Sequence, residues 1–198
     1  MVPGPKATIH TGVWSSRRPR ADDTELLAAL AVIQARGAIG ERSLERAVAH
    51  ADRFVELVPA GRCSLLDLGS GGGLPALVIA WRRRDVAVTM VERRASRADL
   101  LRRAVASLGL AGRTTVLNSD VARIASDAPH SFEVVTARSF GDVTITARYI
   151  GMLLVAGGVG LVSEPPTDRT EAWISVLDDQ SSLLDGGVYQ GIRQLLKV

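Results

Sequence analysis

The sequence has little of what disulfide-bonded, zinc-binding or membrane-spanning proteins require. Its 198 residues include one cysteine, Cys63, which excludes an internal disulfide framework and a multi-cysteine metal site. The three histidines, His10, His50 and His130, lack the spacing of zinc ligands, so we expect no metal site. No run of about 18 apolar residues occurs, and no apolar segment follows the basic residues near the N-terminus. We therefore expect a cytoplasmic protein that does not associate with membranes.

Aromatic residues and lysine are also scarce. Aromatic residues make up 4% of a chain that is 46% hydrophobic, so the core is aliphatic, as is typical of helices packed on a parallel sheet. The formal net charge is +3, and among the 24 basic residues only Lys6 and Lys197 are lysines. Arginine suits phosphate groups because its guanidinium is planar, bidentate and always charged. A GC-rich genome produces the same bias, so the composition adds only modest support for nucleic-acid binding.

The chain divides into three parts by composition and apolar spacing. Residues 1–20 form a basic, proline-containing arm that we expect to be flexible. Helical spacing from Thr24 to about residue 36, and again over 41–57, predicts an N-terminal helical extension over 21–59. Residues 60–198, a length suited to one α/β domain, form the third part.

Within this third part, strand-like and helical segments alternate. The expected strands, which are short and apolar, are 64–68, 86–91, 113–117, 132–136 and 158–163, with one or two more within 186–198. The expected helices are 74–84, 95–109, 121–125, 142–155 and 169–178. This alternation predicts a doubly wound, Rossmann-like, mostly parallel sheet with right-handed crossovers. Its ligand crevice should lie beyond the carboxyl ends of the strands.

The strongest chemical signal is a glycine-rich loop. Residues 65–75 read Leu-Leu-Asp-Leu-Gly-Ser-Gly-Gly-Gly-Leu-Pro, so a buried strand leads directly into the loop. Glycine permits a positive φ and lets a ligand approach the main chain closely. Residues 71–76 also satisfy the G-x-G-x-x-A fingerprint of dinucleotide-binding proteins, so the loop alone does not identify the nucleotide.

Two carboxylates discriminate between the candidate nucleotides. Asp67 directly precedes the glycines, where it would repel a pyrophosphate but attract the ammonium group of S-adenosylmethionine. Glu92 ends the apolar strand 86–91, where a carboxylate can accept both ribose hydroxyls. Alternatively, Asp67 caps the following helix and Glu92 pairs with Arg93 or Arg94. Because both acids end strands of one crevice, we favour S-adenosylmethionine.

A third carboxylate, Asp120, follows the expected strand 113–117. In this architecture the turn faces the adenine. A carboxylate or a backbone group there can accept a hydrogen bond from the exocyclic amine of the adenine. Asp120 is equally well placed to cap the helix that begins at Val121. Both roles stay open, and they are compatible.

The residues quoted above resemble a known family. Residues 67–75 with Val91-Glu92 resemble the signature of class I S-adenosylmethionine-dependent methyltransferases. The Gly-Ser-Gly-x-Gly-x-Pro variant of the loop, the helix 93–102 and the segment 134–140 resemble the GidB/RsmG family of 16S ribosomal RNA guanine-N7 methyltransferases. This resemblance covers roughly residues 45–163. It implies a seven-stranded class I methyltransferase fold, S-adenosylmethionine as cofactor, and ribosomal RNA or the small ribosomal subunit as partner.

The resemblance also implies a role for individual residues. The methionine side of the cofactor would be lined by Asp67, Gly69, Ser70, Gly71, Gly73 and Leu74. Glu92 and the adjoining Arg93 would hold the ribose. The adenine would lie against the turn formed by Ser119, Asp120 and Val121. Arg138 would contact the cofactor beside the transferable methyl and serve as the catalytic residue. The alternative is that Arg138 forms an ion pair at the surface.

The chain departs from the family pattern in several respects, among them two motifs. Asp120-Val121-Ala122 stands where Arg-Ala-Glu is usual, and Ser163-Glu164 stands where Lys-Gly usually ends the fifth strand. Two other functions therefore stay open: a small-molecule methyltransferase on the same scaffold, and a non-catalytic paralogue that binds S-adenosylmethionine. The oligomeric state is not indicated by the sequence.

Several residues could contact RNA. The arginines within 82–84 and 93–97 offer a basic surface, and Trp14, Trp81 and Trp173 could stack on bases. Trp81 is equally well explained by helix packing.

Overall fold

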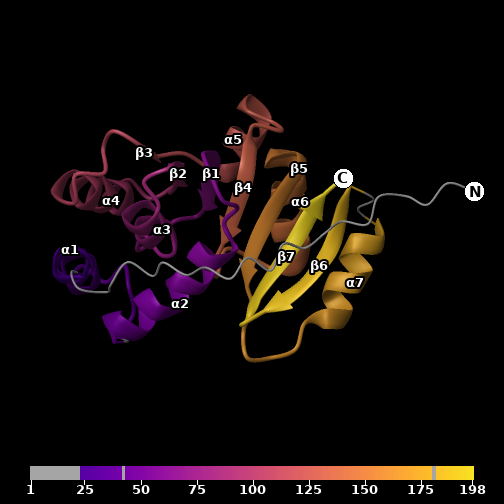
Figure 1. Ribbon diagram of the computed structural model, residues 1–198, viewed down its shortest axis with the longest axis horizontal. Coiled ribbons are helices and arrows are strands. Elements are labelled where there is room, and N and C mark those ends of the chain that lie inside the picture. The colour runs from indigo at the N-terminus through magenta and orange to yellow at the C-terminus, as the bar shows by residue number, and fades with distance from the viewer. Residues whose placement is uncertain (1–22, 42, 180–181) are drawn as a thin grey trace, which may run out of the picture.

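The computed structural model describes residues 23–41, 43–179 and 182–198, so the arm expected over 1–20, with Trp14, lies outside the described residues (Figure 1). Seven strands form one sheet in the order β3-β2-β1-β4-β5-β7-β6. The strands are β1 (Cys63–Leu68), β2 (Val86–Val91), β3 (Thr114–Leu117), β4 (Phe132–Ala137), β5 (Leu154–Ser163), β6 (Leu183–Tyr189) and β7 (Ile192–Lys197). The helices of the described residues are α1 (Thr24–Ala35), α2 (Leu44–Leu57), α3 (Ala76–Arg82), α4 (Ala95–Ser107), α5 (Val121–Asp127), α6 (Val143–Leu153) and α7 (Thr170–Asp179).

The sheet reverses its winding direction at its centre. Strand β1 pairs in parallel with β2 on one side and with β4 on the other, and β7 is antiparallel to both β5 and β6. The connections from β1 and from β4 therefore leave toward opposite edges of the sheet. Their carboxyl ends lie side by side at this switch point, which is where open α/β sheets bind their ligands.

Helices cover both faces of the sheet, which is why its central strands are continuously apolar. Leu65 on β1 is fully buried against the layer that contains α1 to α4, and its neighbour Leu66 is fully buried against the layer of α5, α6 and α7. Successive residues of a strand point to opposite faces, so both must be apolar here.

The structure differs from the expected boundaries at three elements. Helix α6 ends at Leu153, and the apolar residues expected to continue it begin β5, where Leu154 pairs with Phe132. Helix α2 begins at Leu44 rather than near residue 41, because the Ser43 side chain accepts the Arg46 N–H and caps the helix. Strand β6 begins at Leu183, ahead of the segment assigned to closing strands.

None of the helices in the described ranges has both the length and the apolar character needed to cross a bilayer. Within those same ranges, no group of three or more histidine, cysteine, aspartate or glutamate side chains is arranged to hold a metal ion.

Candidate active site

The glycine-rich loop turns at the carboxyl end of β1, where the backbone requires glycine. Gly69, Gly71 and Gly73 have φ values of +60°, +51° and +88°, a region that L side chains rarely adopt. Gly72 is constrained by contact instead: a Cβ atom there would lie 2.4 Å from Cγ1 of Ile39 and 2.7 Å from the carbonyl oxygen of Ala38. The turn that follows α1 therefore packs directly on the loop.

Asp67, the residue two positions before Gly69, is a buried carboxylate with one unpartnered oxygen. Its side chain is 1% exposed, and Oδ1 accepts a 2.6 Å hydrogen bond from the hydroxyl of Thr136 on β4. Oδ2 has no hydrogen-bond partner among the described residues. Burial raises the pKa of Asp67 to about 6, against the opposing effects of the Thr136 hydroxyl and the Arg138 charge.

Asp67 does not cap the next helix, which was the structural alternative for this residue. Helix α3 begins after Pro75, at the far end of the loop, and has no side-chain cap. A buried carboxylate oxygen without a donor costs free energy, and a cationic group brought to it would remove that cost.

Glu92, the first residue after β2, holds the loop and the start of α4 together. It is 5% exposed; Oε2 accepts the Gly71 N–H at 3.0 Å and Oε1 accepts the Arg94 N–H at 2.8 Å. These are bonds to the backbone, so the expected alternative, an ion pair with the guanidinium of Arg93 or Arg94, is not what the structure shows. Each carboxylate oxygen retains a lone pair that can accept a hydroxyl.

The turn after β3 lies beside the end of β2. Asp120 caps α5, because its Oδ1 accepts the Ala122 N–H at 2.8 Å, and the adenine role proposed for Ser119, Asp120 and Val121 stays a prediction. Asn118, which the sequence reasoning missed, donates from Nδ2 to the backbone oxygens of Glu92 and Arg93, each at 3.0 Å. Its position directly after a strand, at the crevice edge, was the available signal.

Arg138 and Phe140 follow β4 at the same edge of the sheet. Ala137, the last residue of β4, pairs with Leu68 in the residue register, so Arg138 is adjacent to Gly69 across the switch point. The Phe140 ring, also missed from the sequence, lies so close that a Cβ on Gly69 would be 2.8 Å from its Cδ2 atom. The Phe140 ring also makes an edge-to-face contact with Tyr149 of α6, at 6.0 Å between ring centroids.

Glu164, where the family pattern has glycine, is engaged in a network with two arginines. It accepts hydrogen bonds from Nε of Arg193 at 2.8 Å and from Nε of Arg169 at 3.0 Å. Arg193, which is almost completely buried, also pairs with Asp185 and lies over the Trp173 ring at 5.5 Å. Glu164 thus anchors the segment after β5 to β7.

One expectation about the RNA-binding surface is wrong and another holds only in part. Trp173 is 0% exposed beneath Arg193, so it cannot stack on a base. Arg82 pairs with Asp23 and Asp52, and Arg83 pairs with Asp85, so within 82–84 only Arg84 is exposed and outside the ion pairs of the described residues. Trp81 is partly buried against the apolar core, as the packing alternative proposed.

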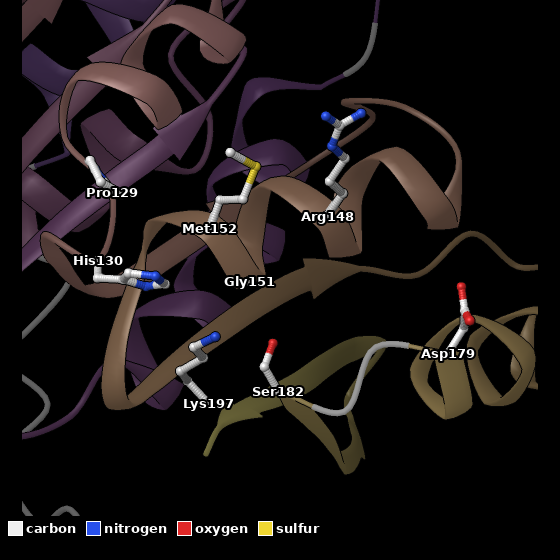
Figure 2. A pocket seen from close by; sticks show the side chains of 8 residues that line it. All are labelled: Pro129, His130, Arg148, Gly151, Met152, Asp179, Ser182 and Lys197. Atoms are coloured by element: carbon white, nitrogen blue, oxygen red, sulfur yellow. The ribbon is translucent and has the colours of Figure 1, made fainter.

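One cavity of the described residues lies away from this site. It has a volume of about 480 Å³ and is lined by residues that include His130, Met152, Ser182 and Lys197 (Figure 2). His130 precedes β4 and Met152 lies near the end of α6, while Ser182 precedes β6 and Lys197 ends β7. The cavity thus lies at the edge of the sheet where β4 and β5 begin. The cavity is therefore at the opposite end of the strands from Asp67 and Glu92.

Comparison with known proteins is consistent with this geometry. Residues 39–173 match the GidB family model, described as rRNA small subunit methyltransferase G. A ribosomal RNA small subunit methyltransferase G from Acidothermus cellulolyticus is 38% identical over 128 residues, which cover 63% of this chain and 55% of that protein. Its counterpart from Salinispora tropica is 39% identical over 131 residues, covering 62% and 54%. The chain spans about half the length of the curated relatives it matches.

Solved structures confirm the fold expected from the sequence. A protein from Methanococcus maripaludis assigned as an S-adenosyl-L-methionine-dependent methyltransferase superposes with a TM-score of 0.63 at 14% identity, covering 88% of this chain and 90% of that one. A methyltransferase from Geobacter sulfurreducens gives 0.62 at 16% identity, covering 91% and 90%. The α/β architecture with a seven-stranded, mostly parallel sheet is thus that of the class I methyltransferases.

Proposed function

Since the chain belongs to the GidB family, rRNA small subunit methyltransferase G, we propose that it transfers a methyl group from S-adenosylmethionine to guanine N7 of 16S ribosomal RNA. The observation that carries the proposal is the buried Asp67 carboxylate, whose Oδ2 has no partner among the described residues, at the mouth of the glycine-rich loop. Such a substrate would place the protein in the cytoplasm.

The residues at the switch point fit S-adenosylmethionine better than a dinucleotide. The cofactor has an ammonium group that Asp67 would receive, and it has no pyrophosphate for that carboxylate to repel. Glu92 would accept the ribose hydroxyls through the lone pairs that its two backbone hydrogen bonds leave. Gly69, Ser70, Gly71, Gly73 and Leu74 would line the methionine side, Arg93 would adjoin the ribose, and Ser119 to Val121 would face the adenine. When bound, the cofactor supplies an electrophilic methyl group on a sulfonium.

The chain's own contribution to the reaction is positioning and exclusion of water. Guanine N7 has a free lone pair, so its attack on a methyl group requires no general base. Arg138 would hold the target through an acceptor edge of guanine or a phosphate. Phe140, whose ring covers Gly69, would keep water from this end of the crevice.

Methyl transfer to ribosomal RNA tests the proposal directly. Purified protein is incubated with methyl-labelled S-adenosylmethionine and, in parallel, with small ribosomal subunits lacking native N7-methylguanine, with protein-free 16S RNA and with a panel of small-molecule acceptors. We expect label in 16S RNA, located at a guanine N7 by mass spectrometry, and none with the Asp67→Asn variant. Label in small molecules alone would indicate the alternative enzyme, and cofactor binding with no transfer would indicate a non-catalytic paralogue.

A further inference from the structure

A groove of about 450 Å³ lies between the end of α1 and the side of α4 that residues 94–103 form. Four arginines, Arg36, Arg94, Arg97 and Arg103, are among the residues that line it. The groove is a different feature from the switch-point crevice, although the two are adjacent.

The charge of this groove is not accounted for by the fold. No ion pair within residues 23–41, 43–179 and 182–198 involves any of its four arginines, whereas Arg82, Arg83 and Arg193 are all paired. The carboxylate that lines the groove, Asp99, is engaged by Arg102 at 2.7 Å. Like charges held together repel one another unless an anion lies between them.

Helix stability explains only one of these arginines. Arg36 directly follows α1 as its C-cap residue, where a cation interacts favourably with the helix dipole. Arg94 and Arg97 lie at the beginning of α4, where the dipole disfavours cations and where no acidic residue offsets them. The two side chains are therefore better explained by an anionic ligand that they bind.

The groove shares two of its walls with the candidate active site. The backbone N–H of Arg94 donates to Oε1 of Glu92. On the other wall, Gly37 leads into the Ala38-Ile39 turn that contacts Gly72 of the glycine-rich loop. A polymer that occupies the groove would consequently pass beside the ribose side of the cofactor site.

We infer that this groove binds the sugar–phosphate backbone of the RNA substrate through its four arginines, an inference that rests on the proposed function. Guanidinium groups bind phosphate oxygens in a bidentate manner and carry no information about base sequence. The contact would hold the strand in register while the target guanine enters the crevice near Arg138. Several positive charges along an open groove suit a strand that carries one phosphate per nucleotide.

The test compares two matched double variants by RNA binding in the absence of cofactor. Arg97→Gln with Arg103→Gln removes two charges from the groove, and Arg123→Gln with Arg148→Gln removes two from α5 and α6 on the other face. Fluorescence polarisation of a short labelled single-stranded RNA is measured over a range of salt concentrations. Because each phosphate contact contributes about 0.7 to the slope of log K against log salt, we expect the groove variant to lower the slope by about 1.4 and the control to leave it unchanged.

Further measurements make each outcome decisive. S-adenosylhomocysteine affinity equal to that of the wild type shows that the groove variant is folded. An equal loss of slope with single-stranded DNA of the same sequence supports phosphate contact. The inference is overturned if the groove variant keeps the wild-type slope or if the control variant loses as much slope. It is also overturned if the protein binds polyglutamate tightly in place of RNA. Methyl transfer by the wild type is scored separately, so failure of the proposed function is distinguishable from failure of the groove.

Discussion

The hydroxyl of Thr136 on β4 donates to Oδ1 of Asp67 on β1 at 2.6 Å, across the two strands where the sheet reverses its winding. This bond fixes a buried carboxylate, and its second oxygen has no partner among the described residues. The Thr136 hydroxyl thus holds the Asp67 carboxylate in place, and the unpartnered oxygen leaves a buried negative charge that a cation would stabilise.

The first prediction concerns the stability cost of Asp67. Burial raises the pKa of Asp67 from 3.8 to about 6, so the unfolded chain loses this proton at lower pH than the folded chain does. The stability of the wild type should fall as pH rises from about 4 to about 6, by about 3 kcal/mol in total. Asp67→Asn removes the charge and should be the more stable protein above pH 6, with the difference vanishing below about pH 4. Urea unfolding without cofactor measures this, and parallel pH profiles for the two proteins would contradict it.

The second prediction concerns Arg138, whose positive charge lowers the pKa of Asp67. If the cofactor's ammonium binds the ionised Asp67 as proposed, affinity for S-adenosylhomocysteine should weaken in the wild type as pH falls through about 6. Arg138→Gln should move that midpoint to higher pH and should impair methyl transfer more than cofactor binding. Arg123→Gln on α5, whose side chain is 78% exposed, is the matched control. An unmoved midpoint, or equal losses of binding and transfer, would count against the role given to Arg138.

The third prediction concerns the two backbone hydrogen bonds of Glu92. Glutamine at this position has one acceptor oxygen, so Glu92→Gln leaves the N–H of Gly71 or of Arg94 without an acceptor. We expect a loss of about 1–3 kcal/mol in unfolding free energy, together with weaker binding of S-adenosylhomocysteine. Glu56→Gln on the exposed face of α2 should change neither quantity. A Glu92→Gln variant as stable as the wild type would show that these bonds do not hold the loop.

The fourth prediction concerns the contact between the glycine-rich loop and the turn after α1. A Cβ on Gly72 would meet Ile39 and the Ala38 carbonyl, whereas a Cβ on Gly112 would meet nothing within 4 Å. Gly72→Ala should therefore cost about 1–3 kcal/mol of stability and lower the cofactor affinity. Gly112→Ala should be neutral or slightly stabilising, because alanine restricts the unfolded chain. Equal melting behaviour of the two variants would refute the tight packing at Gly72.

The sequence predicts the parts of this molecule that local pattern controls. The apolar strands that carry Asp67 near the end of β1 and Glu92 just after β2 indicate the ligand-binding edge of the sheet, because parallel strands place their carboxyl ends at one edge. The glycines with positive φ are likewise visible, since only glycine adopts that backbone without strain.

Contacts between distant segments could not be predicted in this way. Thr136 meets Asp67 only because β4 pairs with β1, and Arg82 meets Asp23 only because α1 and α3 share one layer. The burial of Trp173 likewise depends on where Arg193 of β7 lies. Residue type and spacing do not determine such pairings until the tertiary fold is known.

Calorimetric titration with S-adenosylhomocysteine and with NAD tests the central claim most directly. The wild type at pH 8 should bind S-adenosylhomocysteine and fail to bind NAD, because the proposed role of the carboxylate at the mouth of the glycine-rich loop is to accept an ammonium, and the same charge would repel a pyrophosphate. The folded Asp67→Asn variant should bind neither. Undiminished binding of S-adenosylhomocysteine by that variant, or binding of NAD by the wild type, would contradict the account.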